Sequence, residues 1–145
     1  MYTHLLLPTD GSPLSDAAIR QSVLFAREVG AKITGFHAIP EFHIFTHHAE
    51  MLEDTKERFL QDCRAHAKEF LAVLETAAKE AGVPCDTVIA VTDEPYLEII
   101  RTAEEKGCDL IAMASHGRKG VKGFLMGSET QKVLSHSQIT VLVFR

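Results

Sequence analysis

Short apolar runs alternate with longer amphipathic runs along the whole chain, and this alternation limits the folds that its 145 residues can adopt. The short runs predict strands, and they cover residues 3–8, 32–39, 86–91, 109–114 and 140–144. The longer runs predict helices from Ser12-Pro13 to Gly30, from about 50 to 81, from Pro95 to Gly107 and from about 128 to 136. Strands and helices in strict alternation form a parallel sheet with helices on both faces.

The predicted fold is therefore a Rossmann-like α/β fold, a single doubly wound sheet of five parallel strands. Right-handed crossovers between neighbouring strands leave few topologies, of which the order 3-2-1-4-5 fits this chain best. The sequence contains no internal repeat, no low-complexity tract and no linker. We expect one domain that spans residues 1–145.

In a sheet of this order the winding direction reverses between the first and fourth strands, and ligands bind at the carboxyl ends of those two strands. Residues 8–12 (PTDGS) follow the first strand, and residues 114–128 follow the fourth. The second segment contains four glycines and three basic residues but no acidic one: Gly117, Gly120, Gly123, Gly127, Arg118, Lys119 and Lys122. Glycines allow backbone N–H groups to approach an anion, and Gly127-Ser128 leads into a helix N-terminus, which favours phosphate. This segment predicts a phosphate-binding loop, to which Ser128 and Thr130 add hydroxyl donors.

Two of these positions also have a purely structural interpretation. Ser128 and Gln131 fit the S-x-x-Q pattern of a capping box, in which the serine caps the last helix. Asp10 could contact a ribose hydroxyl or a magnesium ion held by phosphates, but Asp-Gly is also common in turns. The segment 114–128 matches neither the Walker P-loop pattern nor the G-x-G-x-x-G pattern of dinucleotide-binding folds.

The charge balance argues against nucleic acid as a partner. The chain carries 15 basic and 20 acidic residues, a net charge of −5. Neither a membrane-spanning run nor a secretory signal is evident, and three widely spaced cysteines without a C-x-x-C pair predict a cytoplasmic protein. Histidines at 43, 47 and 48 lie in a segment that we expect to be irregular, so we predict no metal site from them.

The residues at the two strand ends resemble the universal stress protein family, whose fold is also that of adenine nucleotide alpha hydrolases. That family opens with P-T-D-x-S, here residues 8–12, and has G-x-x-G, nine residues and G-[ST] after its fourth strand. In this chain Gly117 is followed by nine residues and then by Gly127-Ser128. Ala114 stands at the position of the first glycine. The segments MASHGR, GSET and TVLV also resemble the family, so that the resemblance covers the whole chain. Alanine fits at the first position if the backbone there is not left-handed.

The resemblance implies a small cytoplasmic stress-response protein of the ATP-binding branch, which binds ATP or AMP. Where Mg²⁺ accompanies the nucleotide, Asp10 would be the residue that contacts it. It implies nucleoside contacts from Pro8, Thr9 and Asp10. It also implies an adenine side formed by Ala38 and Met113 and a ribose and phosphate side formed by Ala114, Gly117, Gly127, Ser128, Glu129 and Thr130. It further implies a homodimer that pairs through strand 140–144.

Two other functions remain open from the residues alone: an interaction module of the same fold that binds no nucleotide, and a very slow ATPase. No nucleophile–base pair is evident in the sequence, so that an enzyme is the less favoured interpretation.

Overall fold

The computed structural model describes residues 1–43, 49–116 and 126–145, and for residues 49–52 it describes only the helical path of the backbone. Five strands and four helices alternate along the chain. They are β1 (His4–Pro8), α1 (Pro13–Val29), β2 (Lys32–Ile39), α2 (Ala49–Ala81), β3 (Cys85–Val91), α3 (Pro95–Glu105), β4 (Leu110–Ala114), α4 (Ser128–His136) and β5 (Thr140–Phe144). These bounds agree with the predicted ones to within a residue or two.

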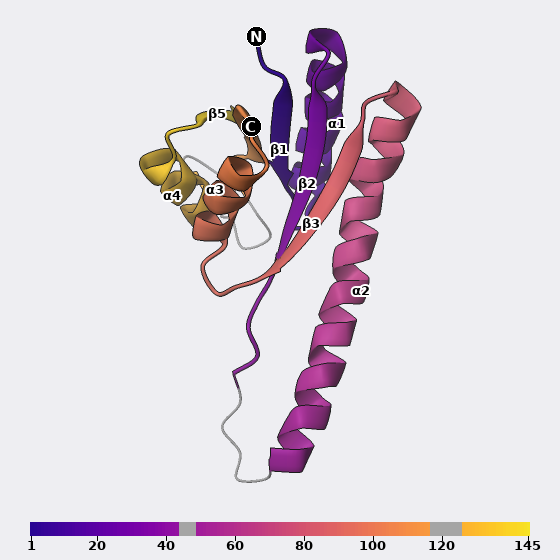
Figure 1. Cartoon of the computed structure of the whole chain (residues 1–145), viewed down its shortest axis with the longest axis vertical. Coiled ribbons are helices and arrows are strands. Elements are labelled where there is room, and N and C mark those ends of the chain that lie inside the picture. The colour runs from indigo at the N-terminus through magenta and orange to yellow at the C-terminus, as the bar shows by residue number, and fades with distance from the viewer. Residues whose placement is uncertain (44–48, 117–125) are drawn as a thin grey trace.

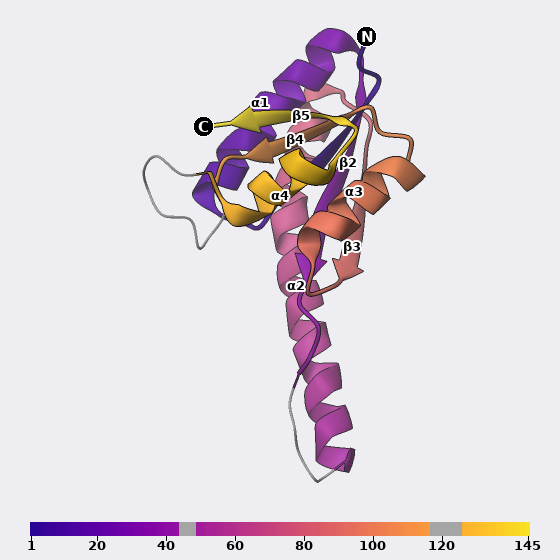
Figure 2. The same cartoon turned by 90° about the vertical axis from the view of Figure 1, so that its left-hand side faces the viewer.

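The five strands form one sheet in the order β3-β2-β1-β4-β5, and all four neighbouring pairs are parallel. This confirms the predicted order. In the central strand Leu6 pairs with Thr34 of β2 on one side and with Ile111 of β4 on the other. Figure 2 shows β4 and β5 along one side of the sheet, and the two outermost strands are β3 and β5.

Alternate side chains of β1 enter two separate hydrophobic cores, which explains why helices cover both faces of the sheet. Leu5 and Leu7 pack with Ile19, Val23, Leu74 and Ala78 of α1 and α2. Leu6 packs on the other face with Ile99, Ala103 and Val133 of α3 and α4. All three leucines are at most 2% exposed, and each contributes about 1.5–3 kcal/mol by leaving water.

The first helix begins and ends where its sequence predicts. The Ser12 hydroxyl accepts a hydrogen bond from the Ser15 backbone N–H at 3.1 Å, and Pro13 occupies the first helical position. Gly30 ends the helix in the left-handed conformation, with φ of 73°. These two residues fix the bounds of α1.

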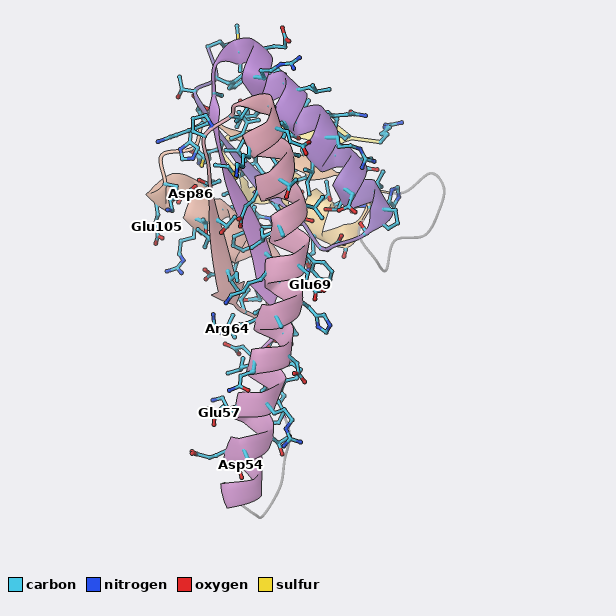
Figure 3. All side chains as sticks on the ribbon, turned by 90° about the vertical axis from the view of Figure 1, so that its right-hand side faces the viewer. Asp54, Glu57, Arg64, Glu69, Asp86 and Glu105 are labelled. Carbon is cyan, nitrogen blue, oxygen red and sulfur yellow. The ribbon has the colours of Figure 1, made fainter. Side chains whose placement is uncertain are left out.

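The second helix is much longer than the sheet that it covers, and its first half projects beyond the strands (Figure 1). Its second half is packed through the buried residues Ala67, Leu71, Leu74 and Ala78, which recur every three or four positions. Gly35 of β2 permits this packing, since a Cβ atom there would lie 2.4 Å from Leu74 Cδ2. The exposed charged residues Asp54 and Glu57 lie on the projecting half (Figure 3).

A polar network joins the amino ends of β1, β2 and β3. The Thr34 hydroxyl donates to Asp86 Oδ1 at 2.5 Å, so its oxygen accepts from Nε2–H of His4 at 2.7 Å. Lys106 Nζ donates to Asp86 Oδ2 at 2.9 Å. Burial, followed by the charge of Lys32, lowers the pKa of His4 below its usual 6.5. Burial acts to raise the pKa of Asp86, but the hydrogen bonds from Thr34 and Lys106 outweigh it and hold that pKa below 3.8.

None of the helices in the described ranges is both long enough and apolar enough to cross a membrane.

Candidate functional site

A cavity of about 510 Å³ lies at the carboxyl ends of the strands, a volume within the range of small-molecule sites. All of the site residues predicted from the sequence line it, except Gly117, which lies outside the described residues: Pro8, Thr9, Asp10, Ala38, Met113, Ala114, Gly127, Ser128, Glu129 and Thr130. The predicted switch point and the cavity therefore coincide. Seven further residues line the cavity and were not predicted: Ser15, Phe36, His37, Asp93, Pro95, Ile99 and His116.

Hydrogen bonds to its own residues and to β2 hold the loop between β1 and α1. Asp10 Oδ1 accepts from the Ser12 backbone N–H at 2.9 Å, which is the turn geometry that Asp-Gly predicts. The Thr9 carbonyl accepts from Nδ1–H of His37 at 2.7 Å, because a carbonyl can only accept. The Ser15 hydroxyl donates to Thr9 Oγ1 at 2.7 Å. Asp10 therefore has a turn role and also lines the cavity.

The long helix α2 supports this loop from behind through Phe70. The Phe70 ring meets the His37 ring edge to face, with centroids 5.3 Å apart. Gly11 has φ of 77°, and a Cβ atom built on it would lie 2.4 Å from the Phe70 ring. Only glycine fits at this position, because both the backbone conformation and the space behind it exclude a side chain.

The segment between β4 and α4 is closed at its base, where Gly127 N–H donates to the Ser115 carbonyl at 2.6 Å. The Thr130 hydroxyl donates to the Ala114 carbonyl at 2.9 Å, and this hydrogen bond joins α4 to the end of β4. No described residue other than glycine has a positive φ, so Ala114 is not left-handed. Alanine therefore fits the position at which the family motif has its first glycine.

The capping box predicted as the alternative role of Ser128 is not formed, and that interpretation is wrong. Gly127 is the N-cap residue, Ser128 is the first residue of α4, and no side chain caps the helix. The Gln131 side chain instead donates to the Met126 carbonyl at 2.7 Å. The Gly127-Ser128 pair thus brings an N-terminus without a side-chain cap to the cavity wall, as anion binding requires.

Glu129 links the two helices that cover this side of the sheet. Its Oε2 accepts from the Tyr96 backbone N–H at 3.0 Å, so a carboxylate stabilises the N-terminus of α3. Lys132 Nζ lies 3.5 Å from Glu129 Oε1 and 5.4 Å from the centroid of the Tyr96 ring. The N-termini of α3 and α4 therefore meet at one wall of the cavity.

The described wall of the cavity carries carboxylates and imidazoles. Asp10, Asp93 and Glu129 line it together with His37 and His116, and no lysine or arginine of the described ranges does. The basic residues predicted to assist phosphate binding, Arg118, Lys119 and Lys122, lie outside the described residues. The Ser115 hydroxyl lies 3.0 Å from Nδ1 of His116, but Ser115 is 5% exposed and does not line the cavity.

The chain is similar in sequence to known proteins over its whole length. The model of the universal stress protein family matches residues 1–145. The universal stress protein YxiE of Bacillus subtilis is 34% identical over the full length of both chains.

Solved structures show the same fold. The structure of protein MJ0577 of Methanocaldococcus jannaschii, a universal stress protein, superposes with a TM-score of 0.84 at 28% identity, over 99% of this chain and 95% of that one. A universal stress protein solved in complex with cAMP superposes with a TM-score of 0.71 at 24% identity, over 99% of this chain and 97% of that one.

Proposed function

We propose that this chain, which belongs to the universal stress protein family, binds an adenine nucleotide, ATP or AMP, and acts as a regulatory dimer. The observation that carries the proposal is the position of Gly127 and Ser128. They bring the N-terminus of α4 into a cavity that also contains the P-T-D loop of β1. A helix N-terminus at a topological switch point suits a phosphate group, and the cavity volume suits a nucleoside. A protein of this fold has been solved with cAMP, itself an adenine nucleotide.

The lining residues suggest how the ligand would lie. Ala38 and Met113 offer small or apolar surface for the base, and Asp10 at the loop tip offers a carboxylate for a ribose hydroxyl. If Mg²⁺ accompanies the phosphates, Asp10 suits it, because carboxylate oxygens are ligands that Mg²⁺ prefers. Glu129 would act indirectly through the N-terminus of α3, since its carboxylate accepts from Tyr96 N–H.

The substitution Gly127→Glu tests the proposal. Gly127 has φ of −57° and ψ of 147°, which any residue adopts, so the variant adds bulk and negative charge at the phosphate position without backbone strain. Calorimetric titration with Mg-ATP and with AMP should show binding to the wild type and none to the variant. Gln138→Glu, which adds the same charge beyond the other end of α4, is the matched control and should bind normally.

Nucleotide binding would be contradicted by no heat and no thermal stabilisation at millimolar nucleotide. Normal binding by Gly127→Glu would contradict the placement of the phosphate at Gly127. The first result would favour the interaction module of the same fold. Denaturing the purified protein and identifying any released nucleotide by mass spectrometry would show which nucleotide is held in the cell.

The edge strand β5 supports the dimer. Among the described strands β5 pairs only with β4, which leaves its other edge open to a second copy. Val143 is half-buried and belongs to neither hydrophobic core, unlike Val141, Leu142 and Phe144. Val143→Lys should therefore convert a dimer to a monomer in light scattering while leaving the fold intact.

We also propose a cytoplasmic location for the protein, since Cys63, Cys85 and Cys108 are all unpaired.

A further inference from the structure

One histidine and two carboxylates from distant parts of the chain meet at the rim of the cavity. Glu41 and His43 follow β2, and Asp93 follows β3. His43 Nε2 is hydrogen bonded to Asp93 Oδ2 and lies 3.9 Å from Glu41 Oε2. One potential ligand atom from each residue lies within 4.8 Å of the other two. Asp93 also lines the cavity, so this group of three forms part of its edge.

Two hydrogen bonds hold the backbone around the three residues in place. The Thr92 backbone N–H donates to the Ile39 carbonyl at 2.8 Å, which extends the pairing of β2 and β3 to the two segments. The Glu41 backbone N–H donates to Asp93 Oδ1 at 3.1 Å and so orients that carboxylate while Oδ2 faces His43. A ligand carboxylate that is fixed by a second hydrogen bond is the usual arrangement around protein-bound metals.

We propose that Glu41, His43 and Asp93 form a binding site for one divalent transition-metal ion, with Zn²⁺ as the best fit. Two carboxylates balance the charge of the ion, and the imidazole nitrogen favours Zn²⁺ over Mg²⁺ or Ca²⁺, which prefer oxygen ligands. Three protein ligands leave a fourth tetrahedral position for water or for a group on a molecule in the cavity.

Small side-chain movements would be needed to place an ion between the three residues. Ligand atoms about 2.0–2.2 Å from Zn²⁺ lie about 3.4 Å apart in a tetrahedral site. Glu41 would therefore move closer to His43 than its present 3.9 Å, and the hydrogen-bonded atoms of His43 and Asp93 would move apart to admit the ion. The side chains of Glu41, His43 and Asp93 are 54%, 62% and 44% exposed, so they are free to move by this amount. An exposed His43–Asp93 ion pair without metal would contribute little to stability.

This site is separate from the proposed position of Mg²⁺ at Asp10. Asp10 follows β1 and Asp93 follows β3, and these strands are separated in the sheet by β2. Strands two places apart lie about 10 Å from each other. The inference does not depend on the proposed function, because Glu41, His43 and Asp93 are not among the residues proposed to hold the nucleotide.

The test is a titration of the nucleotide-free full-length protein with Zn²⁺, followed by calorimetry, and with Co²⁺, followed by visible absorption. The expected result is one ion per chain, with affinity reduced at least about tenfold in both His43→Gln and Asp93→Asn. The matched controls are Glu94→Gln, which removes the neighbouring exposed carboxylate, and His136→Gln, which removes an exposed histidine on α4. Both should bind as the wild type does.

Absence of binding by the wild type, or wild-type affinity in His43→Gln, would overturn the proposal. Equal losses in the controls would also overturn it, because they would assign the metal to scattered surface groups. Circular dichroism of each variant separates loss of the site from loss of the fold. Since no nucleotide is present, failure here leaves the proposed nucleotide binding untouched, and failure of nucleotide binding leaves this result untouched.

Discussion

His37 on β2 donates a hydrogen bond from Nδ1 to the Thr9 carbonyl, 2.7 Å away, across 28 positions of sequence. This bond ties the end of β2 to the loop that carries Asp10, and Phe70 of α2 packs against the same imidazole. The loop conformation therefore depends on two elements other than the one that it follows.

His37→Phe should weaken nucleotide binding about fivefold to tenfold, because the ring still packs on Phe70 but the Thr9 carbonyl loses its partner. The unfolding free energy should fall by about 1–2 kcal/mol. Calorimetric titration with Mg-ATP measures the first effect and urea unfolding the second. His66→Phe is the control, since His66 also contacts Phe70 but does not line the cavity. Equal affinities in wild type and His37→Phe would show that the bond does not position the loop.

Gly11→Ala should destabilise the protein by about 2–4 kcal/mol. The substitution combines the cost of a left-handed backbone, about 1 kcal/mol, with overpacking against the Phe70 ring, about 1–3 kcal/mol. Gly30→Ala has a nearly equal φ of 73° but nothing within 4 Å of the added Cβ, so it should cost only about 1 kcal/mol. Urea unfolding of both variants isolates the contribution of Phe70 as their difference. If the two variants lose equal stability, the contact with Phe70 carries no energy.

Ser22→Ala should stabilise the protein by about 0.5–1.5 kcal/mol. Ser22 is fully buried in α1, and its hydroxyl has no hydrogen-bond partner among the described residues. Alanine removes that hydroxyl and has the higher helix propensity. Ser15→Ala, on the same helix, should instead cost about 1 kcal/mol, because the Ser15 hydroxyl donates to Thr9. Thermal and urea unfolding should therefore shift in opposite directions for the two variants.

Stability should fall as the pH decreases below 6.5, and His4 should account for part of the loss. Its pKa is lowered in the folded protein, so the folded state holds a neutral imidazole while the unfolded chain takes up a proton below 6.5. The contribution of His4 to the free energy of unfolding is fully present above pH 6.5. It is lost as the pH falls through the lower pKa that His4 has in the folded protein. Asp86 and Asp109 have pKa values below 3.8 and lose their contributions only in more acidic solution.

Urea unfolding of wild type and His4→Gln between about pH 7.5 and about pH 5 measures this effect. Glutamine can still donate to Thr34 but does not titrate, so the stability of the variant should depend less on pH. Parallel curves for the two proteins would contradict the assignment to His4.

The fold could be predicted because its determinants are local in sequence. Ser12 and Gly30 bound α1 through hydrogen bonds and a backbone angle that lie within a few residues of each. The strand order then followed from the alternation of elements and the handedness of their connections. The predicted site residues likewise lie at the ends of β1, β2 and β4 and at the N-terminus of α4, where the fold alone brings them together.

The missed residues depend on contacts between distant elements. His37 is an ordinary strand residue in the sequence, and its bond to Thr9 appears only when β2 lies beside β1. In the sequence His43 stands out only as a neighbour of His47 and His48, whereas the structure pairs it with Asp93, which is 50 positions away. The capping box failed because α4 begins one residue earlier than S-x-x-Q requires, with Gly127 instead of Ser128 as its N-cap.

The position of Phe70 gives the projecting half of α2 a mechanical property. Phe70 lies beside the β1–α1 loop, close to where the packed half of the helix begins at Ala67. The first residue of α2 lies about 30 Å from Phe70 along the helix axis. A tilt of about 10° at Phe70 would therefore displace that end by about 5 Å. Because the helix is continuous, a small tilt beside the β1–α1 loop would become a larger displacement at the first residue of α2.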